Sequence, residues 1–394
     1  MSRTTIPARP AWALAAVASL SLVLTACGAG ESSDEAAAGS GSGTSGASAA
    51  SVDEAKAQVE EWSKEITEWP EVAPIAKPAD LKGKKVTIIP LGDQIPVIHG
   101  VGVGEQQALE KLGATVNVCD GKFNPTTIAD CLKTAGDQKV DYVITNFVDY
   151  DMVPAAIDAL TKSGTKVLVG SMHESKKAKK NENLAFFDAT ERVALLYEAM
   201  AIDAYAGQGE KTHPLFLKLM DSSTTKTASE RMISKFEELC PSCESSSVEF
   251  TTANLDKLAS TVSAELVSNP ETNAIVVPVD TFVPPAIQGA KSANKIKQVK
   301  VYSSSSDVAG LQRVKDGTQE SDLGTPVIFE GWKHVNALMQ MASGEEVQPA
   351  DVLVTRAFTP DNVKDLELDP KTYLTDDWFG TGYQDDFLTA WGVK

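Results

Sequence analysis

Several side chains that could bind a small molecule directly follow short apolar runs of the sequence. Carboxylates, amides and guanidinium groups can pair with adjacent hydroxyl groups, and aromatic rings can cover the apolar C–H face of a solute. This combination of residue types predicts non-covalent binding rather than bond-breaking chemistry. The residues that could supply it include Asn146, Phe147, Asp280 and Phe282.

Four of the five cysteines fall into two pairs of near neighbours. Cys119 ends an expected strand and Cys131 lies on the next expected helix, so a disulfide between them is geometrically reasonable. Cys240 and Cys243 would close a tight loop after a helix, and these pairings are one of three possible sets. A Cys-x-x-Cys can also be a redox pair or half of a zinc site. Here it follows a helix, whereas a thioredoxin-like pair precedes one, and no second pair supports zinc.

Other residue types that serve catalysis or cofactor binding lack the required spacing. The four histidines show no helical metal-ligand spacing, and no pair of nucleophile and base can be proposed. Gly100, Gly102 and Gly104 invite a dinucleotide-binding interpretation, but Glu105 occupies the place of the third fingerprint glycine. The sequence therefore predicts no enzyme, no cofactor and no metal site.

The N-terminal segment is expected to target and tether the chain. Residues 1–26 combine two arginines with an apolar run of about 14 residues, which is short for a membrane span of roughly 20. Cys27 follows Leu-Thr-Ala, which resembles the bacterial lipobox, in which the cysteine is lipidated; a simple signal peptide is the alternative. Residues 27–51 are mostly Ala, Gly, Ser and Thr and lack the apolar surface to fold. Acylation would hold the protein at the outer face of the cell membrane.

Beyond this tether, strand patterns alternate with helix patterns. A helical extension is expected in residues 52–81, and three prolines end its helix. Short β-branched runs then alternate with helical stretches of about 10–15 residues, which is typical of βαβ units and parallel sheets. Strands are expected at residues 84–90, 114–118, 140–145, 166–170, 214–220, 247–251, 274–278 and 299–302. Helices are expected at residues 53–69, 99–112, 125–135, 151–163, 190–206, 226–239, 254–268 and 283–292.

The alternation restarts after residue 189, which predicts two similar lobes. In open parallel sheets, ligands bind beyond the carboxyl ends of the strands, so two facing lobes would form a cleft there. The loops after strands are therefore candidate binding segments. In the first lobe their candidate residues are Gln94, Asn146, Phe147, Asp149 and Ser171. Asp149 could instead only cap the helix that follows it.

The order of these segments resembles type I periplasmic substrate-binding proteins, in particular the sugar-binding branch related to ribose-binding protein. The resemblance covers about residues 82–360, and it includes Asn-Pro-Glu-Thr-Asn-Ala-Ile-Val-Val-Pro-Val-Asp at residues 269–280. Each segment by itself is common, but their order over nearly 280 residues is specific. The other segments are residues 84–90 with 104–113, 140–146 with Asp149, 165–169, 231–239, 299–307, 315–317 and 356–363.

The resemblance implies further ligand contacts in the second lobe. Arg231 lies near the helix start at which the family carries a ligand-binding arginine, although it could also be a solvated helix residue. Asp280 matches the acid after the Val-Pro-Val strand. Either Ser305 or Asp307 matches the acid after the next strand, and Thr325 lies where a glutamine often contacts the ligand.

Two positions depart from the sugar-binding pattern. Residues 95–98 keep the proline of an Asn-Pro-aromatic-aromatic stretch but lose the asparagine and both aromatic residues. The Asp-Arg pair of ribose-type proteins would fall at Ser171 and Met172, so that charged contact is missing. These losses favour fewer polar contacts or a less polar solute.

The implied fold is α/β, with two similar Rossmann-like lobes whose parallel sheets are joined by a three-segment hinge. The N-terminal lobe is expected to contain residues 82–188 plus 326–355, and the C-terminal lobe residues 189–325 plus 356–394. Such a molecule closes over one small solute by hinge motion. The crossovers are expected near residues 188–191, 323–326 and 354–358.

The resemblance implies a monomeric receptor that delivers a small solute, with a sugar or sugar-like polyol as the first hypothesis, to the permease subunits of an ABC importer. A lipid anchor would keep it near its permease at high effective concentration. The formal net charge of −18 opposes attraction to nucleic acid, so no nucleic-acid partner is expected. Two other hypotheses stay open: the same fold and role for a less polar, non-sugar metabolite, and an exported redox or hydrolytic lipoprotein.

Overall fold

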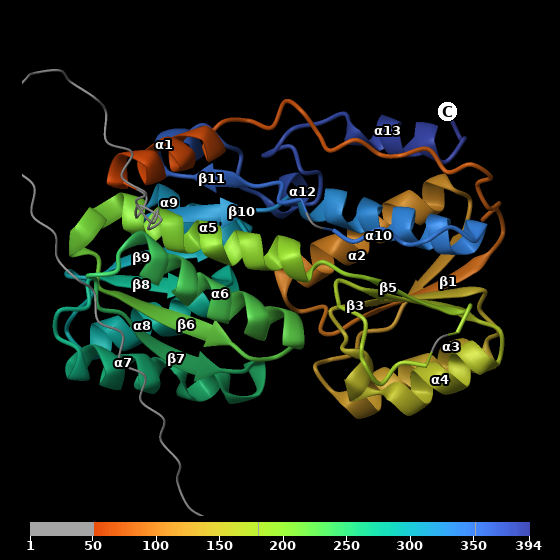
Figure 1. Cartoon of the computed structure of the whole chain (residues 1–394), viewed down its shortest axis with the longest axis horizontal. Coiled ribbons are helices and arrows are strands. Elements are labelled where there is room, and N and C mark those ends of the chain that lie inside the picture. The colour runs from red at the N-terminus through yellow and green to blue at the C-terminus, as the bar shows by residue number, and fades with distance from the viewer. Residues whose placement is uncertain (1–50, 180, 351) are drawn as a thin grey trace, which may run out of the picture. The chain divides into compact units, whose positions relative to one another are not determined.

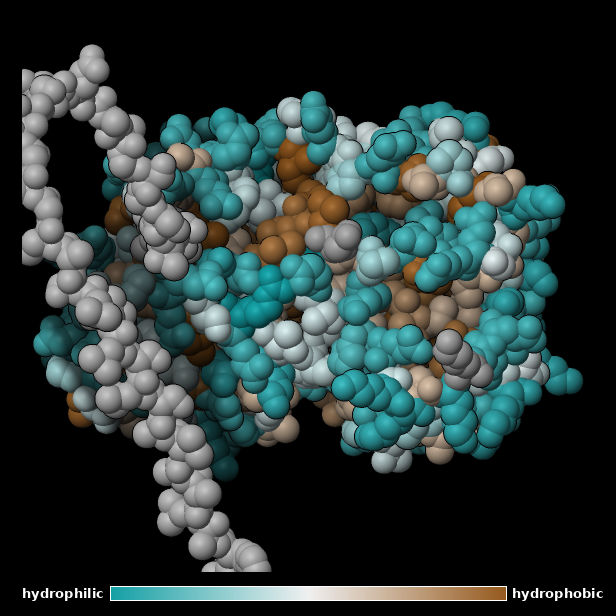
Figure 2. Space-filling model, viewed as in Figure 1, coloured by the Kyte–Doolittle hydropathy of each residue, from teal (hydrophilic) through white to brown (hydrophobic). Residues whose placement is uncertain are grey.

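The structure is a computed structural model that describes residues 51–394 except residues 180 and 351. The expected signal peptide, the expected lipidation at Cys27 and the tether up to residue 50 lie outside the described residues. Within the described part, no helix has the length and apolar composition needed to cross a bilayer. Figure 2 shows that the visible surface of this part is mainly hydrophilic, with smaller hydrophobic patches.

Helix α1 (Val52–Trp62) begins with a capping box at Ser51 and packs against the body of the protein, where Ala55 is buried. The sequence pattern predicted this helix to continue to Trp69, and that boundary is wrong. After Trp62 the backbone leaves the helix, and the Ile66 amide donates to the Phe379 carbonyl at 2.9 Å. Pairing with a distant segment replaces the helical hydrogen bonds here.

The first sheet has five parallel strands in the order β2-β1-β3-β4-β5. The strands are β1 (Lys85–Pro90), β2 (Thr115–Val118), β3 (Tyr142–Asn146), β4 (Lys166–Gly170) and β5 (Leu184–Phe187). Helices α2 (Pro96–Lys111) and α10 (Val327–Ser343) cover one face, and α3 (Pro125–Asp137) and α4 (Pro154–Lys162) cover the other (Figure 1). The four strands expected in this region are confirmed.

The second sheet has six strands in the order β11-β10-β9-β8-β6-β7, and only the β10–β11 pair in it is antiparallel. The strands are β6 (Pro214–Leu219), β7 (Ser246–Phe250), β8 (Ala274–Val277), β9 (Lys300–Ser304), β10 (Ser321–Gly324) and β11 (Arg356–Phe358). Helices α5 (Thr190–Gln208) and α6 (Ser223–Leu239) cover one face, and α7 (Leu258–Ser268) and α8 (Val283–Ser292) cover the other (Figure 1). The expected α/β class with two parallel sheets is confirmed.

Strands β5, β10 and β11, of three or four residues each, were not among the strands expected from the sequence. The β10 sequence, Ser-Asp-Leu-Gly, contains one large apolar residue, so it carries no strand pattern. The remaining helices are α9 (Val308–Lys315), α11 (Pro360–Val363), α12 (Pro370–Tyr373) and α13 (Tyr383–Ala390). The short 3₁₀ helices are η1 (Tyr150–Met152), η2 (Gly209–Lys211), η3 (Thr252–Lys257) and η4 (Asp280–Phe282).

The C-terminal segment contacts elements of both halves of the described chain. Strand β11 pairs with β10 in the second sheet. Helix α13, by contrast, packs against α10, where the rings of Trp332 and Trp391 stack at 5.5 Å and Trp391 Nε1 donates to Asn336 Oδ1 at 2.9 Å. The proposed lobe boundaries stay a prediction, and residues 370–394 pack largely on the helix that the sequence analysis assigned to the N-terminal lobe.

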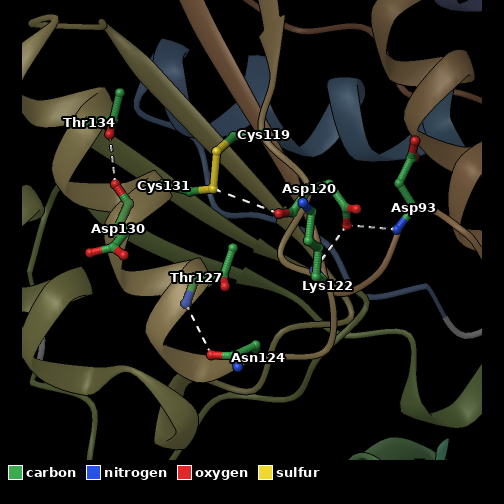
Figure 3. Close-up of a disulfide and its surroundings, with 9 residues drawn as sticks. All are labelled: Asp93, Cys119, Asp120, Lys122, Asn124, Thr127, Asp130, Cys131 and Thr134. Carbon is green, nitrogen blue, oxygen red and sulfur yellow. Dashed lines mark hydrogen bonds between the residues drawn. A yellow bond between two sulfur atoms is a disulfide. The ribbon is translucent and has the colours of Figure 1, made fainter.

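Both disulfides expected from the sequence are confirmed. Cys119 is bonded to Cys131 with 5.8 Å between their Cα atoms, and Cys240 is bonded to Cys243. The first bond ties the end of β2 to α3 (Figure 3). Next to it, Asp120 Oδ1 accepts the amide of Asp93 at 3.0 Å and therefore connects the loop after β2 with the loop after β1.

Candidate functional site

Each of three strands is followed directly by a residue whose backbone angle φ is positive. Phe147 follows β3 with φ 61°, Ser171 follows β4 with φ 62°, and Ser305 follows β9 with φ 106°. This left-handed region is uncommon for residues other than glycine, and such residues concentrate at functional sites. The turns therefore mark the carboxyl ends of both sheets as the place to look for a site.

A pocket of about 110 Å³ lies there, with walls from both sheets and from helix α5. This volume is well below the roughly 300–1,000 Å³ of pockets for drug-sized ligands, so the cavity suits a compact solute. Its apolar lining residues are Leu91, Ile95, Val97, Ile98, Phe123, Phe147, Val193, Leu196, Tyr197, Leu219, Pro278, Val279 and Phe282. Its polar lining residues are Arg192, Asp221, Ser222, Thr225, Thr252, Ser304, Ser305 and Thr325.

Five of the eight polar lining residues are already engaged in internal hydrogen bonds through their side chains. Asp221 accepts from the amide and hydroxyl of Thr252, Ser222 and Thr225 bond each other, and Ser304 donates to the Pro278 carbonyl at 2.6 Å. In the described part of the chain, the other three side chains, those of Arg192, Ser305 and Thr325, make no hydrogen bond, and Arg192 has only an ion pair. The hydroxyl of Tyr197, which also lines the pocket, makes no hydrogen bond there either.

Three of the ten ligand-binding residues expected from the sequence lie on the pocket wall: Phe147, Phe282 and Thr325. Phe282 also packs edge-to-face on Phe250 at 4.9 Å in the core of the second sheet, so it serves both the core and the wall. The two aromatic rings come from opposite sheets. Contact of any of these residues with a solute stays a prediction.

Asn146 and Ser171 belong to a buried network beside the pocket rather than to its wall. The Ser171 hydroxyl is 2.8 Å from His334 Nε2, and His334 Nδ1 is 2.5 Å from Glu105 Oε1. Asn146 Nδ2 donates to Glu105 Oε2 at 2.9 Å. The spacing is similar to a Ser–His–acid catalytic relay. However, Ser171 is 1% exposed and none of the four residues lines the described pocket, so the network fixes the turn after β4.

Asp149 bridges the two halves of the described chain. Its Oδ2 accepts the amide of Ser223 at 3.0 Å and its Oδ1 accepts the Ser223 hydroxyl at 2.8 Å. Ser223 is the first residue of α6, so the carboxylate lies at a helix N-terminus, where negative charge is favoured. Thr224 adds a hydrogen bond to the Ser171 carbonyl at 3.3 Å. Asp149 therefore contacts the opposite half instead of capping the helix after it.

Asp280 and Asp307 lie in a buried polar network behind the strand ends. Asp280 accepts from the Ser303 hydroxyl at 2.5 Å, from the Asp307 amide at 2.9 Å and from Arg313 Nη2 at 3.1 Å. Burial, with the nearby Asp322 as second cause, raises the pKa of Asp280. Burial likewise raises the pKa of Asp307 to about 6. Neither residue lines the pocket. Both carboxylates instead accept hydrogen bonds from neighbouring groups of the protein.

Arg231 and Gln94 also lie away from the pocket wall. Arg231 forms ion pairs with Glu191 and, at 2.6 Å, with Glu198, so its guanidinium holds α6 against α5. Gln94 is exposed in the loop after β1. For both residues, a role in solute binding stays a prediction.

The residues that the sequence analysis missed come mainly from α5. Arg192, Val193, Leu196 and Tyr197 all line the pocket, which places them on one face of this helix. The ligand residues expected from the sequence came mainly from the loops after strands, whereas these four lie on the helix that follows the first crossover. The one available signal was the position of α5 immediately after the expected crossover at residues 188–191.

Solved structures with this fold are numerous. An allitol-bound ABC transporter solute-binding protein from Agrobacterium vitis is 16% identical, with a TM-score of 0.60, and the match covers 72% of this chain and 98% of that one. The myo-inositol binding protein from Caulobacter is 18% identical, with a TM-score of 0.60, and the match covers 75% of this chain and 98% of that one. The 5-methylthioribose transporter solute-binding protein from Thermotoga lettingae is 15% identical, with a TM-score of 0.59, and the match covers 77% of this chain and 98% of that one. At these identities the likeness shows the fold.

The fold and the pocket between strand ends define a solute-binding protein of the type I class. Residues 86–346 match the family described as periplasmic binding protein domain, and the chain therefore belongs to this family. No curated protein matches the chain. The family resemblance inferred from the sequence is confirmed. As a member of a family of extracytoplasmic binding proteins, the chain binds a solute and is not an enzyme.

Proposed function

We propose that this chain is the lipid-anchored solute receptor of an ABC importer, and that it captures its solute by closing two lobes. The lobes are residues 82–188 plus 326–355 and residues 189–325 plus 356–394. The observation that carries the proposal is a pocket whose wall is drawn from the strand ends of both sheets and from α5. Ligand contacts made only in the closed state would favour closure. Residues 1–26 direct export, and acylation of Cys27 keeps the receptor beside the permease.

The solute is a compact molecule that is less polar than a sugar. This choice rests on the wall, in which residues 95–98, the departure from the sugar-binding pattern, contribute Ile95, Val97 and Ile98. A polyol exposes hydroxyl groups on most of its surface and would leave many of them unpaired against such a wall. A sugar or polyol is the second candidate, because the structural neighbours include proteins solved with allitol and myo-inositol.

Solute binding is tested by thermal denaturation of the full chain carrying Cys27→Ser in the presence of sugars, polyols, amino acids, nucleosides and aromatic acids. A solute at 100 times its Kd should add about 2.7 kcal/mol to the free energy of unfolding. The bound form should also show a smaller radius of gyration by small-angle X-ray scattering. A solute that stabilises the protein without compaction would contradict capture by closure, and no stabilisation by any compound would contradict the receptor itself.

Anchoring is tested by the same substitution in cells. The unsubstituted chain should sediment with the membrane fraction and incorporate labelled fatty acid. Cys27→Ser should remove the label and release the protein, since within residues 51–394, as far as they are described, no helix is long and apolar enough to span a bilayer. Cys240→Ser, which alters a cysteine at the far end of α6, serves as the control and should keep both the label and the membrane association.

A further inference from the structure

The pocket contains a buried arginine whose donors are not used by the protein. Arg192 lies in the first turn of α5, is 4% exposed and lines the pocket. Its Nε is 3.2 Å from Glu330 Oε2. Nevertheless, among the described residues the guanidinium donates no hydrogen bond, and its buried Nε lacks a hydrogen-bond partner. A guanidinium has five N–H donors in a planar fork that matches a carboxylate.

Glu330 does not satisfy this arginine by itself. Neither of its carboxylate oxygens has a hydrogen bond, and Oε1 lies 3.8 Å from Lys333 Nζ, so one carboxylate faces two cations. Buried donors without partners are costly, whereas hydrogen bonds between ionised groups away from water are strong. An anion that entered the pocket would therefore gain contacts that the protein leaves unmade.

The rest of the wall has the character of a site for an amphipathic anion. Asp221, the other charged lining residue of the described pocket, already accepts three hydrogen bonds from Thr252, so its charge is stabilised on its own side. Tyr197 lies on the same face of α5 as Arg192, and its hydroxyl is unbonded in the described part. The apolar side chains of the same wall, Ile95 and Val97 among them, cannot pair with hydroxyl groups.

We infer that the solute is a small organic acid with an apolar body, whose carboxylate is bound by Arg192. Tyr197 donates a second hydrogen bond to the same carboxylate, and the apolar body lies between Phe147 and residues 95–98 at the start of α2. This inference rests on the proposed receptor function and specifies its solute class. One charged contact, made by Arg192 at the start of α5, would therefore distinguish this chain from receptors that bind uncharged polyols.

The test compares carboxylates with neutral molecules of the same shape. Benzoate and pentanoate are titrated into the full chain carrying Cys27→Ser, beside benzyl alcohol, 1-pentanol, ribose and myo-inositol, by calorimetry and thermal denaturation. At least one carboxylate should bind about 10- to 100-fold more tightly than its alcohol, the range expected for a charge-assisted contact. Arg192→Gln should remove that preference, and Tyr197→Phe should reduce the affinity several-fold.

Lys235→Gln is the control, because it removes an ion-paired cation of α6 that does not line the pocket; it should leave the affinity unchanged. If Arg192→Gln fails to fold with Glu330 unpaired, the double variant with Glu330→Gln removes both charges and should also lose carboxylate binding. Binding of ribose or myo-inositol without binding of either carboxylate would overturn the inference and leave the receptor function standing. Equal loss in Arg192→Gln and Lys235→Gln would also overturn it.

Discussion

At the residue scale, burial decides the behaviour of several acids more than their neighbours do. Asp203, on α5, is 5% exposed and accepts a short hydrogen bond from the Ser321 hydroxyl. Burial raises the pKa of Asp203 to about 7 in spite of that hydrogen bond. Burial raises the pKa of Asp376 to about 7 as well, although it accepts two amides at the start of α10. Both acids bind protons more tightly in the folded than in the unfolded chain.

The free energy of unfolding should therefore fall as the pH rises from about 4 to about 7. In that range the folded chain keeps protons that the unfolded chain, with ordinary Asp pKa values near 3.9, has released. Asp203→Asn should flatten this fall by as much as about 4 kcal/mol. The remaining slope belongs to Asp376 together with other buried acids whose pKa is raised, among them Asp280 and Asp307. Urea denaturation at pH 4, 5, 6 and 7 measures the free energy of unfolding at each pH. Asp137→Asn, on the surface, is the control, and an identical slope in Asp203→Asn would refute the assignment.

At the scale of the elements, the Cys119–Cys131 bond supports one side of the pocket. It fixes the end of β2 on α3, and the adjacent Asp120 holds the Asp93 amide and the Lys122 amide, each at 3.0 Å (Figure 3). The next residue along the chain, Phe123, is part of the pocket wall. The Cys119–Cys131 bond therefore both stabilises the part of the chain around the first sheet and helps to position Phe123 in the pocket wall.

Replacing Cys119 and Cys131 by serine should lower the free energy of unfolding by about 3 kcal/mol, from the loop-closure entropy of this 12-residue separation. It should also weaken solute binding. Replacing Cys240 and Cys243, which are three residues apart and contribute no lining residue, should cost about 2 kcal/mol and leave binding unchanged. Denaturant titration and calorimetry give both quantities. Equal effects of the two double variants on affinity would argue against a link between the first disulfide and the pocket.

At the scale of the whole described molecule, a direct contact joins the two halves of the described chain beside the pocket. The carboxylate of Asp149, after β3, accepts two hydrogen bonds from Ser223 at the start of α6. The contact links the two sheets directly beside the pocket, without a solute in between. We therefore expect this contact to stabilise a closed arrangement of the two halves relative to an open one; it is called the latch below.

Asp149→Ala should shift the solute-free protein towards a more open form and weaken solute binding about fivefold, the effect of roughly 1 kcal/mol of lost hydrogen bonding. Small-angle scattering should show a larger radius of gyration. Asp151→Ala is the control, because Asp151 bonds Ser175 and Lys177 within the same half. An unchanged radius of gyration and affinity in Asp149→Ala would show that the latch does not contribute to closure.

The sequence by itself determined the α/β class and eight strands of the two sheets, and it offered the two cysteine pairings that the structure shows. These features depend on local patterns: β-branched runs, helical periodicity and cysteines close along the chain. Only the tertiary structure decided which side chains face the pocket. Asp280 and Arg231 have the chemistry of ligand residues, yet ion pairs with Arg313, Glu191 and Glu198 occupy them. Arg192 shows no such signal in the sequence, because a side chain becomes available to a solute only when folding buries it and leaves its donors unpaired.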